Sequence, residues 1–199
     1  MCIRDSLYSF ACLDRKQIDK FTEDFRTVYN KAWVRHAGVK EMTSLQAKAV
    51  IKAMKPILDP DIAYFAYYNN EPVAFFFNLP EVNQVLKKLG TGKLGLWEKI
   101  QFMYHKLMHT NKKMVGRGFG VVPDHQGKGV EAAIVEYCRT IVQDKIRGRY
   151  IDYEMNWIGD FNPKMVRICE TIGKVIKVHH TYRKIFDDSI KFERCPEIK

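Results

Sequence analysis

The 199-residue sequence has no apolar run near the roughly 18 residues that a membrane-spanning helix needs. Its first six residues, Met1 to Ser6, also lack the apolar stretch and the small-residue cleavage site of a signal peptide. They resemble translated sequencing adapter, so we interpret the first residues as non-native and expect the natural protein to extend further upstream. The sequence therefore predicts a cytoplasmic protein without a membrane partner.

Cysteine is sparse and shows no pairing pattern. The five cysteines are odd in number and widely spaced, with neither a CxxC pair nor metal-ligand spacing. Reduced thiols are the simplest interpretation. The pair His179-His180 has no further ligand at suitable spacing, so no metal is expected.

Positive charge is plentiful, but it is not gathered on one element. The net charge of +10 favours anionic partners. The densest basic clusters, Lys112-Lys113 and Arg147-Arg149, are typical of solvated faces. Because neither a Cys/His finger nor an aromatic RNA-binding strand is present, nucleic acid is not expected as a partner. A basic nucleic-acid-binding module is therefore the weakest of the three functions considered for this sequence.

Hydrophobic periodicity predicts one α/β domain over residues 21–187, after an N-terminal segment 1–20 and before a charged tail 188–199. The apolar spacing of Leu96, Ile100, Met103 and Leu107 predicts an amphipathic helix, for which core packing is favoured over a flap above an acceptor pocket. The other expected helices are 21–36, 44–58, a short one within 81–95, 132–142 and 163–172. The expected strands are 62–68, 73–78, 114–122 and 150–155, and a hairpin of 175–178 with 181–186.

The most informative segment joins a strand, a tight loop and a helix start between Gly118 and Ala133. Its loop offers backbone N–H groups from Gln126 to Val130, and Gly127 and Gly129 have no Cβ to block close approach. Free amides at a helix N-terminus, together with the positive end of the helix dipole, suit a phosphate. Lys128 adds a mobile charge. The alternative is an ordinary glycine-rich turn.

Spacing excludes two other phosphate loops. A Walker loop needs Ser or Thr after Gly-Lys, whereas Gly129 follows Lys128. A dinucleotide fingerprint needs a third glycine that opens the helix, and this sequence has no glycine at that position. What is left, Gln126-x-x-Gly129 after Val121-x-Pro123, resembles the pyrophosphate-binding loop of the GNAT superfamily of N-acetyltransferases. In that family's Gln/Arg-x-x-Gly-x-Gly/Ala pattern the last position is Glu131 here. Whether its carboxylate points outward or toward the diphosphate stays open.

Three further matches extend the resemblance to a bacterial subgroup of the family over residues 21 to 186. They are Tyr29-Asn-Lys-Ala-Trp33, Leu79-Pro-Glu-Val-Asn-Gln84, and the set Glu154, Asn156, Trp157, Ile158 and Asn162. The resemblance implies a GNAT-type mixed central β-sheet flanked by helices, with two central strands splayed at the CoA site. It also implies acetyl-CoA, or another acyl-CoA, as co-substrate.

The same resemblance assigns expected roles to residues. Backbone groups of Phe119, Val121 and Val122 would contact the pantetheine arm and the carbonyl. The remaining expected cofactor contacts are Gln126, Gly127, Lys128, Gly129, Val130 and Asn162. Candidate acceptor-binding residues are Asn30, Trp33, Asn83 and Trp157, although Trp33 on an apolar helix face is also typical of a core residue.

Catalytic candidates are less well defined. Glu154 is the candidate base, with an ion pair as the equal alternative, and Asp152 is a weaker choice. The late-helix position where many members carry a tyrosine acid is Cys169, which alternatively is a small core residue. Tyr182 and Tyr153 are the other candidate acids.

We therefore expect an acyl-CoA-dependent N-acyltransferase that transfers acetyl to an unidentified small-molecule or peptide amine by direct attack. A non-catalytic acyl-CoA-binding or sensor domain, or one half of a truncated tandem acetyltransferase, is the alternative. Two partners are left open: a second copy of the chain, which would form a homodimer, and an N-terminal half that the given sequence lacks.

Overall fold

The computed structural model describes residues 7–34, 39–89, 95–187, 189–191 and 193. The chain divides into two compact units, residues 1–154 and 155–199. Within the described ranges, none of the helices has both the length and the apolar character needed to cross a membrane.

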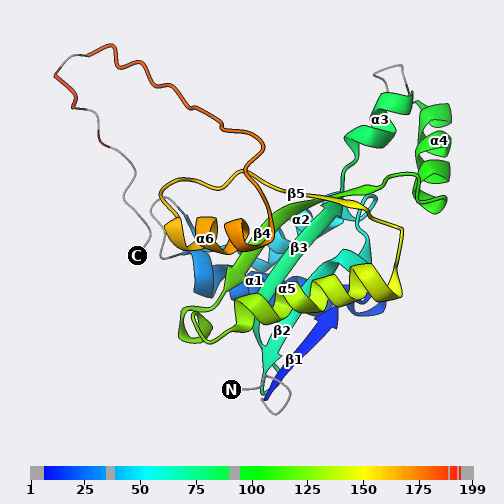
Figure 1. Cartoon of the computed structure of the whole chain (residues 1–199), viewed down its shortest axis with the longest axis horizontal. Coiled ribbons are helices and arrows are strands. Elements are labelled where there is room, and N and C mark those ends of the chain that lie inside the picture. Colours follow the sequence, from blue (N-terminus) through cyan, green and yellow to red (C-terminus); the bar gives the residue numbers. More distant parts are fainter. Residues whose placement is uncertain (1–6, 35–38, 90–94, 188, 192, 194–199) are drawn as a thin grey trace. The chain divides into compact units, whose positions relative to one another are not determined.

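A five-stranded mixed sheet flanked by helices forms the first unit (Figure 1). The order of its strands is the order of the chain, β1-β2-β3-β4-β5, and the pairs β1–β2, β2–β3 and β3–β4 are antiparallel. The elements are β1 (Tyr8–Cys12), α1 (Ile18–Trp33), α2 (Ser44–Met54), β2 (Ala63–Tyr68), β3 (Glu71–Pro80), α3 (Asn83–Leu89), α4 (Leu96–Leu107), β4 (Lys113–Val121), α5 (Val130–Thr140) and β5 (Asp152–Met155).

Two separate cores cover the two faces of the sheet. Because side chains alternate along a strand, Phe65, Phe75 and Phe77 face α1 and α2. Tyr64 and Phe76 point to the opposite face, where α5 packs. Strand β3 is therefore buried on both sides over most of its length, which makes it the centre of the fold.

Local signals explain two of the predicted elements. Helix α2 begins with a capping box, in which Thr43 accepts from the Gln46 amide and the Gln46 side chain accepts from the Thr43 amide. The β2–β3 hairpin turns at Asn69 and Asn70, whose φ angles of 49° and 66° are the left-handed values that such a turn requires. The helix predicted at 44–58 and the strands predicted at 62–68 and 73–78 are thus present as α2, β2 and β3.

The ends of the chain differ from expectation. Strand β1 (Tyr8–Cys12) pairs with β2 within the N-terminal segment 1–20, for which the sequence predicted no helix or strand. In the second unit, α6 (Pro163–Ile172) is present, but the expected hairpin is not. The described residues from 173 to 187 contain no strand, and nearly all of them are exposed. Val175, Val178 and Tyr182 have strand-forming side chains, but β-propensity without a packing partner does not make a strand.

Helix α4 also departs from expectation. All its residues are described, and none of them is buried. It lies next to α3 and stands apart from α1, α2 and α5 (Figure 1). Its apolar stripe faces outward, so the expectation of core packing is not met.

Candidate functional site

The loop between β4 and α5 is held in a defined shape. After Val121 the chain makes a short 3-10 turn over Pro123–His125, and the Gln126 amide donates to Pro123 O at 3.1 Å. The Gln126 side chain then reaches back, and its Nε2 donates to Val121 O at 2.9 Å. Gly127 and Gly129 have φ angles of 69° and 87°, so both glycines are needed for the backbone path.

This loop ends as the N-cap of α5, with Gly129 at the cap position. The amides at the start of a helix have no intrahelical acceptor, and the helix dipole places partial positive charge there. Lys128 is exposed beside them. The segment that the sequence singled out thus has the geometry of an anion-binding helix start.

Glu131 points into this loop. Its Oε1 accepts a hydrogen bond from the Gly127 amide at 3.1 Å. The question that the sequence left open is therefore answered: the carboxylate turns inward and occupies one amide of the cradle. An anionic ligand must either displace this side chain or bind at the remaining amides.

The β4 backbone presents amides on two sides. The Val122 amide donates to Val73 O at 2.9 Å, so it is engaged with β3. In an antiparallel ladder, adjacent residues direct their backbone groups alternately, so Phe119 and Val121 direct theirs away from β3, on the side of β5. The Gln126 bond to Val121 O agrees with this direction. Phe119 and Val121 fit the expected backbone role, and Val122 does not, because its amide is already taken.

On the other face of β4, the absence of a side chain at Gly120 leaves room for the rings of Phe75 and Trp33. A Cβ at Gly120 would lie 2.9 Å from the Phe75 ring and 3.2 Å from Trp33 Nε1. Trp33 itself is half-buried and packs against Tyr29 and Phe75. This environment agrees with the interpretation of Trp33 as a core residue that covers the end of β4.

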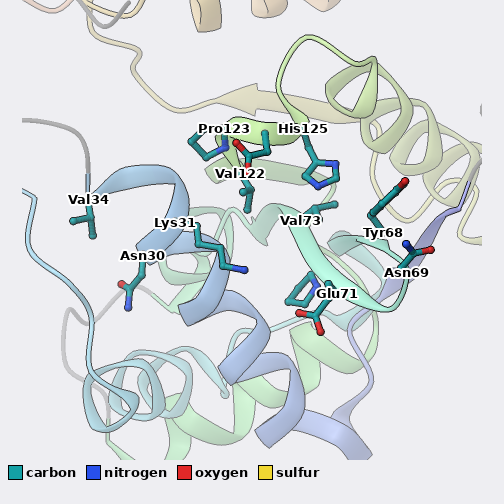
Figure 2. A pocket seen from close by; sticks show the side chains of 12 residues that line it. Asn30, Lys31, Val34, Tyr68, Asn69, Glu71, Val73, Val122, Pro123 and His125 are labelled. Carbon is teal, nitrogen blue, oxygen red and sulfur yellow. The ribbon is translucent and has the colours of Figure 1, made fainter.

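A pocket of about 640 Å³ lies between α1, the β2–β3 hairpin and the start of the loop (Figure 2). Lys31 extends from α1 into this space, and Glu71 comes from the hairpin side. His125 lines the pocket from the loop, and its Nδ1 lies 2.6 Å from Tyr8 Oη. Burial and the nearby Lys128 charge lower the pKa of His125, which favours a neutral imidazole at pH 7.

Of the residues proposed from the sequence, Asn30 and Val122 line this pocket. The Asn30 amide group is already used, because Nδ2 donates to Met42 O at 3.0 Å and Oδ1 accepts from the Met42 amide at 2.8 Å. Asn83 lies elsewhere. It follows Pro80 at the far end of β3, roughly 30 Å of strand away from Glu71.

Glu154, the candidate base, forms an ion pair. Its carboxylate accepts a hydrogen bond from Lys113 Nζ, which also lies 3.6 Å from Asp152. The hydrogen bond to Glu154 raises the pKa of Lys113. The structural alternative for Glu154 is therefore the one that these contacts support, since a carboxylate that stabilises a cation is a weaker base.

Four proposed residues belong to the second unit. Asn162 caps α6, with its Oδ1 accepting from the Met165 amide at 3.1 Å. Cys169 is buried, and burial raises the pKa of its thiol, which keeps it protonated. Trp157 and Tyr182 are 66% and 90% exposed.

The sequence did not point to Lys31, Tyr68 or Glu71 as pocket residues. Their position follows from the β3–β4 register, in which Ala74 pairs with Val121 and so brings the hairpin beside the loop. The Asn69-Asn70 turn was visible in the sequence, but the pairing partner of its second strand was not.

Comparison with solved structures identifies the fold. The chain is similar to an aminoglycoside N-acetyltransferase in complex with CoA, with a TM-score of 0.55, 13% identity, and coverage of 92% of this chain and 99% of that one. It is also similar to a ribosomal-protein-alanine N-acetyltransferase from Brucella melitensis, with a TM-score of 0.52, 14% identity, and coverage of 89% and 99%. The structural neighbours are GNAT acetyltransferases, and the chain has their fold.

Sequence comparison gives more distant relatives. No protein-family model matches the chain. It is 24% identical to Protein YghO of Escherichia coli over 179 residues, and 23% identical to a bacterial ceramide synthase of Caulobacter vibrioides over 193 residues. These matches cover 88% and 86% of this chain but 45% of each relative, so the chain spans about half the length of the curated relatives that it matches.

Proposed function

We propose that the chain is an acyl-CoA-dependent N-acyltransferase that transfers an acyl group, acetyl in the simplest case, to an amine. The observation that carries the proposal is the Gln126–Gly129 loop, in which two left-handed glycines lead into the N-terminus of α5 directly after β4. The fold supports it, because the neighbouring structures include an N-acetyltransferase with CoA bound.

The chemistry is a direct transfer. The neutral amine attacks the thioester carbon, a C–N bond forms, the C–S bond breaks, and the thiolate of CoA leaves. The amine loses one proton and the thiolate gains one. The outward-directed amides of Phe119 and Val121 would hold the pantetheine arm and polarise the carbonyl.

The acceptor is proposed by class only. A ceramide is an N-acyl amide of a long-chain amino alcohol, so similarity to a ceramide synthase supports an amine that carries an alkyl chain. An acyl donor longer than acetyl fits the same similarity. We place the reaction in the cytoplasm, in keeping with Cys12, Cys138 and Cys169 being free thiols.

A second function, a non-catalytic acyl-CoA sensor or one half of a larger enzyme, is favoured by three observations. Glu131 occupies a loop amide, and Glu154 is ion-paired. The share of the curated relatives that the chain covers also fits one half of a longer enzyme.

Two measurements separate these functions. Isothermal calorimetry with acetyl-CoA and palmitoyl-CoA tests binding. Inorganic pyrophosphate serves as a competitor for the loop. A thiol-release assay with a panel of amines, including a long-chain amino alcohol, tests turnover. An enzyme releases CoA only when an amine is present, whereas a sensor binds the thioester without release. The absence of any CoA binding would overturn both.

Matched variants locate the chemistry. If Glu154 acts as the base despite its ion pair, Glu154→Gln lowers kcat with little change in CoA affinity. Glu136→Gln, on the exposed side of α5, serves as the control and should change neither value. If Glu154→Gln leaves kcat intact, the residue is structural and the base lies elsewhere.

A further inference from the structure

Helix α4 carries an unusually apolar exposed face. Seven large apolar or aromatic side chains on it, or directly after it, are at least 49% exposed. They are Leu96, Trp97, Ile100, Met103, Tyr104, Leu107 and Met108. At about 100° per residue they fill one continuous arc of roughly 140°. Exposed hydrophobic side chains are ordinary when they are single, but a contiguous set marks an interaction surface.

The face of α4 opposite the apolar arc contacts the rest of the first unit. Phe102, His105 and Lys106 line a pocket of about 320 Å³ together with Val85 and Tyr150, and Leu107 at the margin of the apolar arc also reaches this pocket. Lys106 Nζ is hydrogen-bonded to Pro56 O, so the inner face of α4 is attached to the body. Most of the apolar arc therefore lies on the side of α4 that is turned away from these contacts.

The charges around this helix indicate the kind of partner. Helices α3 and α4 carry four lysines, Lys87, Lys88, Lys99 and Lys106, and one acidic residue, Glu98. Lys87 and Lys88 on α3 and Lys99 on α4 are exposed. Two copies of the chain that paired through this face would bring these like charges together. A negatively charged surface would attract them.

We infer that the outer face of α3 and α4 docks on an anionic lipid bilayer. A helix with an apolar face that includes Trp, Leu and Ile and with lysines on its margin lies in the membrane interface, with its apolar side among the acyl chains. Trp97 and Tyr104 have the amphipathic rings that favour this depth. The inference departs from the expectation of no membrane partner, since that expectation considered only spanning segments. It does not depend on the proposed acyl transfer.

Vesicle binding tests it. The chain is mixed with vesicles of phosphatidylcholine that contain 30% phosphatidylglycerol, or none, and the bound fraction is measured by flotation. We expect binding to the anionic vesicles, a blue shift of tryptophan emission that is lost in Trp97→Phe, and release at high salt as the Debye length shrinks.

Variants with matched controls locate the surface. The double change Trp97→Glu/Ile100→Glu should lower vesicle affinity at least about tenfold, because it places two charges where acyl chains are contacted. Lys87→Glu/Lys88→Glu should also lower it about tenfold or more, since each basic residue near such a surface strengthens binding about fivefold. Leu45→Glu, at a 79% exposed leucine on α2, is the control and should have no effect. Circular dichroism confirms that each variant is folded.

Three results would overturn the inference. They are no binding to anionic vesicles, binding to neutral vesicles as tight as to anionic vesicles at every salt concentration, or a loss of vesicle affinity in Leu45→Glu as large as in Trp97→Glu/Ile100→Glu. Sedimentation that shows a dimer sensitive to Trp97→Glu, without vesicle binding, would assign this face to a second copy of the chain instead. If this chain binds vesicles but a longer natural protein that contains it does not, the apolar face would be assigned to contact with the remainder of that protein instead.

Discussion

Replacing Glu131 with alanine is expected to tighten the binding of CoA and to weaken the fold at the same time. The carboxylate accepts a hydrogen bond from the Gly127 amide at 3.1 Å, and this amide is one of the donors that a phosphate oxygen at the helix start would use. Carboxylate and phosphate therefore compete for one donor. Removing the side chain frees the amide and also removes a negative charge next to a polyanion.

The size of the effect can be estimated from this geometry. A hydrogen bond to a charged group contributes about 1.5–3 kcal/mol, and repulsion between two charges about 5 Å apart in a water-like medium costs about 1 kcal/mol. The side chain is half-exposed, so the lower end applies. We expect Glu131→Ala to improve CoA affinity by about 1–2 kcal/mol, or roughly five- to thirtyfold. Glu131→Gln, which keeps an acceptor but loses the charge, should lie between.

Stability should change in the opposite direction. An acidic residue in the first turn of a helix stabilises it by about 0.3–1 kcal/mol, so Glu131→Ala should lower the melting temperature by a few degrees. Calorimetry with CoA and a thermal melt measure the two effects. Glu136→Ala, five residues further along α5 and paired with Arg139, is the control, for which CoA affinity should stay unchanged. Unchanged or weaker CoA binding by Glu131→Ala would refute the competition.

Three further predictions concern the body of the fold. Gly120→Ala should destabilise the protein by about 1–3 kcal/mol in guanidinium unfolding, because its Cβ would lie 2.9 Å from the Phe75 ring, whereas Gly118→Ala, at 3.3 Å, should stay within about 1 kcal/mol of the parent. Burial pushes the pKa of Asp61 upward, but hydrogen bonds from Lys145 and Arg149 outweigh it and hold the pKa below its usual value. Its contribution to stability is then present above about pH 4 and is lost as the pH falls through the lowered pKa, so Asp61→Asn should lose less stability than the parent between pH 7 and pH 3. Burial raises the pKa of Cys138 to about 11, so iodoacetamide at pH 8 should leave this thiol unlabelled until the protein unfolds, and rapid labelling in the native state would contradict its burial.

Elements with a local signal could be predicted from the sequence. The Asn69-Asn70 turn, the Thr43 cap and the Asn162-Pro163 helix start are each specified by neighbouring residues, and all are present. The glycine loop belongs to the same class, since its left-handed positions allow few side chains. These features need no knowledge of distant partners.

What could not be predicted depends on such partners. Strand β1 exists because β2 offers a free edge, and the hairpin expected within 175–186 has strand-forming residues but no strand in the structure. The orientation of Glu131 and the Lys113–Glu154 ion pair join groups whose proximity the sequence does not encode locally. The outward face of α4 is the clearest case, because its periodicity fixes the stripe but not the direction in which the stripe points.

Agreement between strand order and chain order has a consequence for how the molecule is made. Every strand after β1 hydrogen-bonds to the strand that precedes it in the chain. A ribosome that releases the polypeptide from its N-terminus would deliver each strand after β1 to an edge that has already been synthesised, so β1 alone waits for its first partner. Assembly could then proceed alongside translation, with little exposed edge left open to aggregation.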